Sequence, residues 1–124
     1  MKNKIKLNLG CFNKKLPGFV NVDIRKDVDP DVVDNAFSLD KFENNSIDLI
    51  YACHMLEHLD YKETEQAFSR WLEVLKTGGV LRLAVPDLEG VFAHYFYYKK
   101  LDVLMHMLYG SQRHDFDFHK NGWD

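Results

Sequence analysis

Two residues near the start of the chain have side chains and positions suited to binding a nucleoside. Gly10 directly follows residues 5–9, whose alternating pattern predicts a first strand, and a glycine there lets a ligand approach the backbone closely. Asp23 lies near the end of residues 19–24, which predict a second strand, and a carboxylate there can accept hydrogen bonds from both ribose hydroxyls. Each residue alone is equally well explained as a turn glycine or a solvated acid. Adjacent strands would bring both to one ligand.

The spacing of this glycine and acid disfavours a dinucleotide. A dinucleotide fingerprint has the pattern GxGxxG, followed by an acid about 20 residues later. Here residues 10–15 contain one glycine, and Asp23 follows Gly10 by only 13 positions. The connection is too short for a full crossover helix with a pyrophosphate at its N-terminus. A nucleoside without a pyrophosphate therefore fits the loop better.

The rest of the hydrophobic pattern predicts further strands that alternate with loop or helical crossovers. These strands are expected at residues 32–33, 47–52 and 80–85. Such alternation is typical of a parallel sheet. We therefore expect an α/β fold with a doubly wound, Rossmann-like and mostly parallel sheet, formed by residues 1–124 as one domain.

Helices are predicted in the second half of the chain. Residues 61–76 have an apolar face at helical spacing, a capping-box pattern at Asp60 and Glu63, and a terminating glycine pair at 78–79. Residues 88 to about 108 predict a second helix, whose aromatic stripe is more often core packing than the wall of an acceptor site. A short helical turn is expected at residues 54–59.

Polar and small residues follow the ends of the predicted strands. In an open α/β sheet, ligands bind beyond the carboxyl ends of the strands. We therefore expect these residues to share one edge of the sheet: Gly10, Cys11, Asp23, Asn35, Ala36, Cys53, His54, Pro86 and Asp87.

Composition excludes several function classes. The chain has 124 residues, a formal net charge of −3 and no cluster of lysine or arginine, so no nucleic-acid partner is expected. No apolar run approaches the roughly 18 residues of a membrane span, and the N-terminus does not resemble a signal peptide. The two cysteines form no disulfide framework. We therefore expect a cytoplasmic protein without a membrane partner.

Several motifs resemble one family. The segments LNLGC at residues 7–11 and LPGFVNVD at 16–23 resemble the opening of small type-11-like S-adenosylmethionine-dependent methyltransferases. The segments SIDLIYA at 46–52 and HMLEHL at 54–59 resemble the fourth strand of that family and the turn after it. WLEVLKTGGVL at 71–81 resembles the following helix, glycine turn and fifth strand, and residues 117–123 resemble a later segment. The order and spacing of these motifs cover nearly the whole chain.

The resemblance implies a class I methyltransferase fold with S-adenosylmethionine as cofactor. Cofactor contacts are then implied by position in the motifs: Gly10 and Cys11 at the methionine part, Asp23 at the ribose, Ile24 and Phe37 around the adenine, Asn35 and Ala36 at the adenine edge, and Cys53 and His54 near the sulfonium. The cofactor-binding part would be residues 1–87, followed by a helical and tail segment at 88–124.

The chain also departs from the family pattern. Phe12 stands where a second glycine is usual and would narrow the methionine pocket, and Asn35 stands where an acid is usual. The family domain normally continues with two more strands beside the fifth, so we expect a C-terminally truncated domain. The fifth strand would then be an exposed edge, covered by a second copy in a homodimer or belonging to a longer protein.

Methyl transfer from a sulfonium mainly requires proximity and alignment, and a base only where the acceptor must lose a proton. Candidate bases are His54, Glu57, His58 and Asp87, of which Glu57 and His58 are equally explained as helix-start residues and Asp87 as a helix cap.

A zinc pattern is also present, because His54, Glu57 and His58 match the HxxEH motif of some peptidases. That motif needs a long helix and a further ligand, whereas here a predicted strand ends just before it. The other histidines considered show no ligand spacing of their own: His106, His114 and His119. We therefore expect no metal.

The leading functional hypothesis is methyl transfer to a small-molecule or glycan-type acceptor. The alternative is a non-catalytic, truncated methyltransferase-like binding or interaction protein. A nucleotide-dependent oxidoreductase is a third hypothesis, and the glycine pattern disfavours it.

Overall fold

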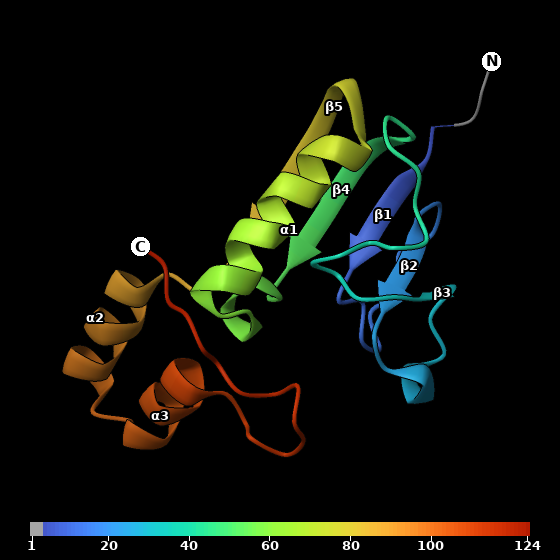
Figure 1. Cartoon of the computed structure of the whole chain (residues 1–124). Helices are drawn as coiled ribbons and strands as arrows, with labels where there is room; N and C mark the ends of the chain where they lie inside the picture. The colour runs from blue at the N-terminus through green and yellow to red at the C-terminus, as the bar shows by residue number, and fades with distance from the viewer. Residues whose placement is uncertain (1–3) are drawn as a thin grey trace.

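The computed structural model describes residues 4–124 and shows a five-stranded, all-parallel sheet (Figure 1). The strands lie in the order β3-β2-β1-β4-β5. Their bounds are β1 (Lys6–Leu9), β2 (Val20–Asp23), β3 (Val32–Val33), β4 (Ile47–Cys53) and β5 (Leu75–Ala84). The Rossmann-like α/β class is confirmed. From β1 the chain adds β2 and β3 on one flank of β1, and then adds β4 and β5 on its other flank. The strand order therefore reverses between β1 and β4, which is where ligands bind in such folds.

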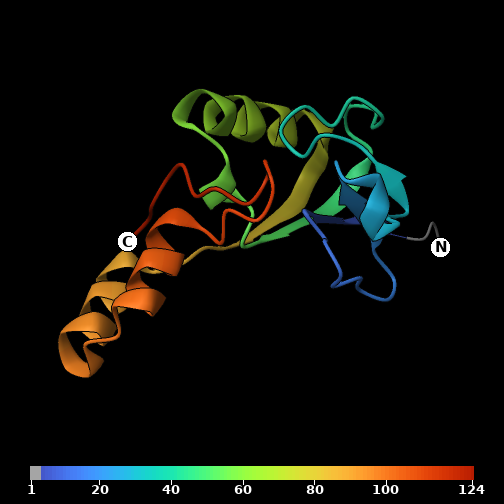
Figure 2. The ribbon, with the colours of Figure 1, turned by 90° about the horizontal axis from the view of Figure 1, so that it is seen from below.

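Helix α1 (Tyr61–Val74) covers one face of this sheet (Figure 2). It begins where predicted, because Asp60 accepts a hydrogen bond from the Glu63 backbone N–H and the Glu63 carboxylate accepts one from the Asp60 N–H. Its buried side chains meet the inward-facing residues of the strands in one core, which includes Leu7, Ile50 and Trp71. The loop of residues 10–19 lies on the opposite face (Figure 2).

The end of α1 differs from the prediction. The helix stops at Val74, because Leu75 takes an extended conformation and pairs with Ile47 at the start of β5. Gly78 and Gly79 therefore lie inside β5 and do not cap the helix. Close packing explains why residue 79 is a glycine, since an added Cβ would lie 2.8 Å from the carbonyl oxygen of Lys76.

The predicted helix at residues 88–108 is wrong as a single element. It is divided into α2 (Leu88–Tyr98) and α3 (Leu101–Tyr109), because Lys99 adopts a left-handed conformation with φ 56°. The interpretation of its aromatic stripe as core is also wrong: no residue of either helix is buried, and Phe92 and Phe96 are 42% and 68% exposed. The two helices form a hairpin that stands away from the sheet, beyond the carboxyl ends of its strands (Figure 1).

Two short 3₁₀ helices complete the described elements, η1 (Lys26–Val28) after β2 and η2 (Leu56–His58) after β4. The helical turn predicted at residues 54–59 is thus confirmed in its central part. None of the helices formed by residues 4–124 has the length and apolar character needed to cross a membrane.

Strand β5 is an edge of the sheet. In the described part of the chain it pairs with β4 alone, and its Val80 and Leu83 side chains are exposed. An edge strand presents unpaired backbone groups to any further strand.

Candidate functional site

Gly10 and Asp23 lie together at the carboxyl edge of the sheet. Strands β1 and β2 are adjacent and parallel, with Leu9 opposite Val22, so both chains leave the sheet side by side. The Cys11 N–H donates to the Val22 carbonyl oxygen at 3.1 Å, and the Phe12 N–H donates to Asp23 Oδ2 at 2.8 Å. The glycine loop is therefore bonded directly to the acid.

The Asp23 carboxylate is buried and held in place, but not saturated. Only 8% of the residue is exposed, and its two oxygens accept the backbone N–H groups of Phe12 (2.8 Å) and Arg25 (3.0 Å). A carboxylate has about four acceptor positions, so each oxygen retains a further lone pair. These free acceptor positions fit the two hydroxyls of a ribose, which would donate to them.

A buried amide network that the sequence analysis missed supports the loop between β1 and β2. Asn8 Nδ2 donates to Asn21 Oδ1 (2.9 Å) and to the Lys14 carbonyl oxygen (3.0 Å). The N–H and the Nδ2 of Asn21 each donate to Asp31 Oδ2 at 2.7 Å, and Asn21 Oδ1 also accepts the Leu16 N–H. Asparagine is depleted in strands, so the presence of two asparagines inside short apolar strands could have indicated this network from the sequence.

The space beside Gly10 is occupied by Met55. Gly10 has φ 62°, and a Cβ added there would lie 2.6 Å from Met55 Cγ. The close approach predicted at this glycine is therefore made by a side chain from the turn after β4. Phe12, which stands in place of the family's second glycine, also has a positive φ and is largely exposed at the edge.

The segment after β3 is fixed by its own hydrogen bonds. Asp34 is buried and accepts the N–H groups of Asn35 (2.8 Å) and Lys41 (2.9 Å). The Ala36 carbonyl oxygen accepts the indole N–H of Trp71 at 2.7 Å. Helix α1 thus holds the predicted adenine edge in position.

The two residues predicted to enclose the adenine have different surroundings. Ile24 is exposed beside Asp23, whereas Phe37 packs against the core. Ile24 therefore presents the greater free apolar surface at this edge.

The end of β4 places Cys53 and His54 beside the same edge. The His54 N–H donates to the Ala84 carbonyl oxygen of β5 at 2.8 Å, and Nδ1 of His54 lies 3.3 Å from Glu57 Oε1. Cys11 and Cys53 are both free thiols. Burial, followed by the charge of Asp23, raises the pKa of the Cys11 thiol, so it is protonated and unreactive at neutral pH.

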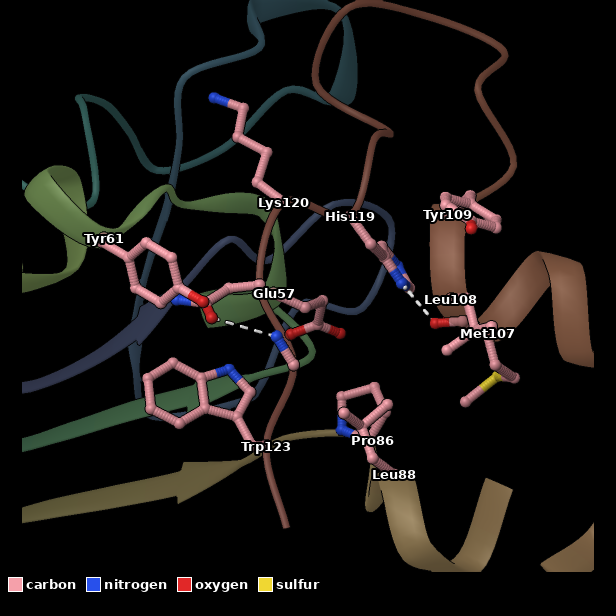
Figure 3. A pocket seen from close by; sticks show the side chains of 12 residues that line it. Glu57, Tyr61, Pro86, Leu88, Met107, Leu108, Tyr109, His119, Lys120 and Trp123 are labelled. Atoms are coloured by element: carbon pink, nitrogen blue, oxygen red, sulfur yellow. Dashed lines mark hydrogen bonds between the residues drawn. The ribbon is translucent and has the colours of Figure 1, made fainter. Parts of the chain in front are cut away.

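The tail of the chain closes a cavity beyond the ends of β4 and β5. The cavity has a volume of about 280 Å³, and its lining includes Glu57, Pro86, His119 and Trp123 (Figure 3). The Trp123 carbonyl oxygen accepts the Leu88 N–H at 2.8 Å, which holds the tail against the start of α2. A second, shallower hollow of about 650 Å³ adjoins it at Tyr61 and Trp123. None of the predicted cofactor contacts lines either of these two spaces.

Of the predicted bases, Glu57 lines this cavity, whereas His54, His58 and Asp87 do not. His58 stacks edge to face on His119, with 4.9 Å between ring centroids, and burial lowers its pKa. Asp87 occupies the N-cap position of α2, but its side chain caps no N–H group there. The sequence did not indicate that His119 lies beside His58, because only the fold brings this residue of the tail next to the turn after β4.

Comparison with known proteins identifies the family. A family model described as a methyltransferase domain matches residues 16–83, which is more than half of the chain. The chain belongs to this methyltransferase family. The match covers β2 to β5 and includes Asp23, the segment after β3 and the turn after β4.

A solved structure supports the fold of the methyltransferase domain. The crystal structure of a SAM dependent methyltransferase from Archaeoglobus fulgidus superposes with a TM-score of 0.63 at 14% sequence identity. The alignment covers 89% of this chain and 62% of that one, so the chain spans less than two thirds of its structural relative. Curated protein sequences give no match.

Gly10→Ala is expected to destabilise the methyltransferase domain by about 2 kcal/mol. The positive φ at Gly10 costs an alanine roughly 1 kcal/mol, and the contact with Met55 costs about as much again. Urea unfolding measures the loss. In a Met55→Ala background the contact with Cγ is removed and only the milder one with Cβ at 3.1 Å remains, so the further cost of Gly10→Ala falls toward about 1 kcal/mol. An equal cost in both backgrounds contradicts the packing described here.

Asp31→Asn is expected to lower stability most at neutral pH. The hydrogen bonds from Asn21 hold the pKa of Asp31 below its usual range, so the ionised form favours the folded state. That contribution is present above the unfolded value of about 3.9 and is lost as pH falls through the folded value. Because Asp31 is exposed, we expect a difference of about 0.5 kcal/mol at pH 7. Thermal unfolding between pH 7 and pH 3 should show that the stability difference between the unmodified chain and Asp31→Asn narrows below about pH 4. A stability difference that stays constant over this range contradicts the role of the Asp31 carboxylate.

Proposed function

We propose that this methyltransferase domain binds S-adenosylmethionine at the carboxyl edge of β1 and β2 and directs its methyl group to a small-molecule or glycan-type acceptor. The observation that carries the proposal is the Asp23 carboxylate, buried, bonded to the glycine loop and retaining free lone pairs. The family membership makes an adenosyl ligand the natural partner of this acid.

The residues that would hold the cofactor are those at the strand ends. Asp23 would accept the ribose hydroxyls, Gly10 and Cys11 would border the methionine part, and Ile24 and Phe37 would lie at the adenine. Asn35 and Ala36 would define the adenine edge, with Cys53 and His54 nearest the sulfonium. When bound, the cofactor supplies an already activated methyl group, so the protein's contribution is alignment and exclusion of water.

The acceptor would approach from the side of residues 88–124, with residues 1–87 holding the cofactor. His54, His58 and Asp87 remain the candidate bases for an acceptor that must lose a proton. We expect the protein to act in the cytoplasm, where its two free thiols stay reduced, without a nucleic-acid or membrane partner.

Isothermal titration calorimetry tests the cofactor assignment. We expect one S-adenosylhomocysteine to bind per chain and NAD to give no heat of binding. Binding of NAD without binding of S-adenosylhomocysteine would favour the oxidoreductase hypothesis and contradict the proposal.

A second candidate function is a non-catalytic binding protein of the same fold. It is favoured by Met55, which fills the space beside Gly10, and by the position of the two described cavities away from the predicted cofactor contacts. Tight binding of S-adenosylhomocysteine without methyl transfer to any acceptor in a broad panel would support this second function.

We further propose that the free edge of β5 is covered by a second copy of the chain. Its exposed apolar side chains and unpaired edge support this. Light scattering should give the mass of a dimer, and hydrogen exchange should show protected β5 amides. A monomer with freely exchanging β5 amides contradicts the dimer.

A further inference from the structure

Glu57 is a buried carboxylate that lacks a full set of partners. Only 2% of the residue is exposed. Its Oε1 lies 3.3 Å from His54 Nδ1, whereas its Oε2 is buried without any hydrogen-bond partner among residues 4–124. Removing a carboxylate from water is costly unless a cation or hydrogen-bond donors replace the water. The unpaired oxygen therefore points to a missing positive partner.

Two histidines stand next to the Glu57 carboxylate. His58 comes from η2 and His119 from the tail, and one potential ligand atom from each of Glu57, His58 and His119 lies within 4.8 Å of the other two. The backbone sets this arrangement, because the N–H groups of Lys120 (2.7 Å) and Asn121 (3.2 Å) both donate to the Glu57 carbonyl oxygen. The tail is thus bonded to η2 next to its histidine.

The hydrogen bonds of both rings leave the same nitrogen available. Nδ1 of His58 lies 3.1 Å from the Phe118 carbonyl oxygen, and Nδ1 of His119 lies 2.7 Å from the Met107 carbonyl oxygen. A carbonyl oxygen only accepts, so each Nδ1 carries the proton and donates it. In a neutral ring, Nε2 then presents its lone pair. Metal-binding histidines typically show this arrangement, in which the ring nitrogen that does not bind the metal donates its N–H to a backbone carbonyl oxygen.

We propose that Glu57, His58 and His119 form a site for a divalent transition-metal ion of the zinc class. Two imidazoles and one carboxylate are ligands that Zn²⁺, Co²⁺ and Fe²⁺ accept, whereas Mg²⁺ and Ca²⁺ prefer oxygen ligands alone. Ligand atoms about 2.1 Å from a tetrahedral ion lie roughly 3.4 Å apart, so binding requires side-chain shifts of at most about 1.5 Å. Glu57 and His119 both line the cavity of about 280 Å³, which leaves room for a further ligand (Figure 3).

The proposed site departs from the expectation of no metal that the sequence favoured. The HxxEH motif does not form the long helix of a peptidase, because η2 spans only Leu56–His58. His54 instead bonds to Glu57, and the third ligand is supplied by His119. The ion would tie the tail to η2, and its binding is independent of any adenosyl ligand.

Titration of the metal-stripped full chain with Co²⁺ tests the site without reference to activity. We expect one Co²⁺ per chain with visible absorption bands of low coordination number, displaced by one equivalent of Zn²⁺. His119→Gln and Glu57→Gln should weaken Zn²⁺ binding by more than about 100-fold, since even loss of an outer partner costs 10–100-fold. His106→Gln, which changes an exposed histidine outside the cluster, should bind as the unmodified chain does.

Because Glu57 is buried, His119→Gln is the decisive variant, and circular dichroism verifies that it is folded. Zn²⁺ should raise the melting temperature of the unmodified chain and of His106→Gln, but not that of His119→Gln. Unchanged Zn²⁺ binding in folded His119→Gln, equal weakening in His106→Gln, or a preference for Mg²⁺ over Zn²⁺ would overturn the proposal.

Discussion

Asp23→Asn is expected to weaken binding of S-adenosylhomocysteine by about 100-fold. Asparagine has one acceptor oxygen where aspartate has two, and it brings an amide donor against a backbone N–H of Phe12 or Arg25. The loss of charged hydrogen bonds to the ribose amounts to about 3 kcal/mol, which corresponds to about two orders of magnitude in affinity. Calorimetry at constant salt measures the change.

Asp48→Asn is the matched control. Asp48 is near the start of β4, at the opposite edge of the same sheet, where its carboxylate accepts the Ile5 N–H and pairs with Lys76. Its replacement by asparagine weakens a hydrogen bond to a backbone N–H, as Asp23→Asn does, and an ion pair. It should leave the affinity for S-adenosylhomocysteine unchanged. If Asp23→Asn retains affinity within about threefold, or Asp48→Asn loses as much, Asp23 does not bind the ribose.

Trp71→Ala is expected to lower the free energy of unfolding by about 3–5 kcal/mol. The indole is fully buried between the sheet and α1, packs edge to face on Phe68, and donates to the Ala36 carbonyl oxygen. Its removal leaves a large cavity and an unpaired carbonyl oxygen. Since small domains have total stabilities of about 5–15 kcal/mol, a loss of this size approaches unfolding.

Urea unfolding of two companion variants separates packing from hydrogen bonding. Trp71→Phe retains most of the apolar volume but not the bond to Ala36, so we expect a loss of about 1–2 kcal/mol and weaker binding of S-adenosylhomocysteine. Leu72→Ala, one residue along the same helix at a side chain 71% exposed, should cost less than about 0.5 kcal/mol. Similar midpoints for Trp71→Ala and Leu72→Ala contradict the core described here.

The arrangement of the sheet was predictable from local pattern. Apolar runs separated by turns locate the strands, and the Asp60–Glu63 capping box locates the start of α1. The proximity of Gly10 and Asp23 then follows from chain order, because β1 and β2 are consecutive, lie side by side as consecutive strands usually do, and end at the same edge of the sheet.

Local pattern could not predict the features that depend on tertiary contacts. The glycine pair at 78–79 is compatible with a helix end and with a strand, and pairing of β5 with β4 decides between them. The aromatic periodicity of α2 indicates a buried face, yet no part of the described chain buries Phe92 or Phe96. The grouping of Glu57, His58 and His119 joins residues about 60 positions apart, which only the fold brings together.

A crystal structure of the domain with S-adenosylhomocysteine tests the central claim most directly. The adenosyl group should lie at the carboxyl edge of β1 and β2, with both ribose hydroxyls within hydrogen-bond distance of the Asp23 carboxylate. An adenosyl group bound instead in the cavity beside Glu57 and Trp123, with Asp23 bonded only to Phe12 and Arg25, would contradict it.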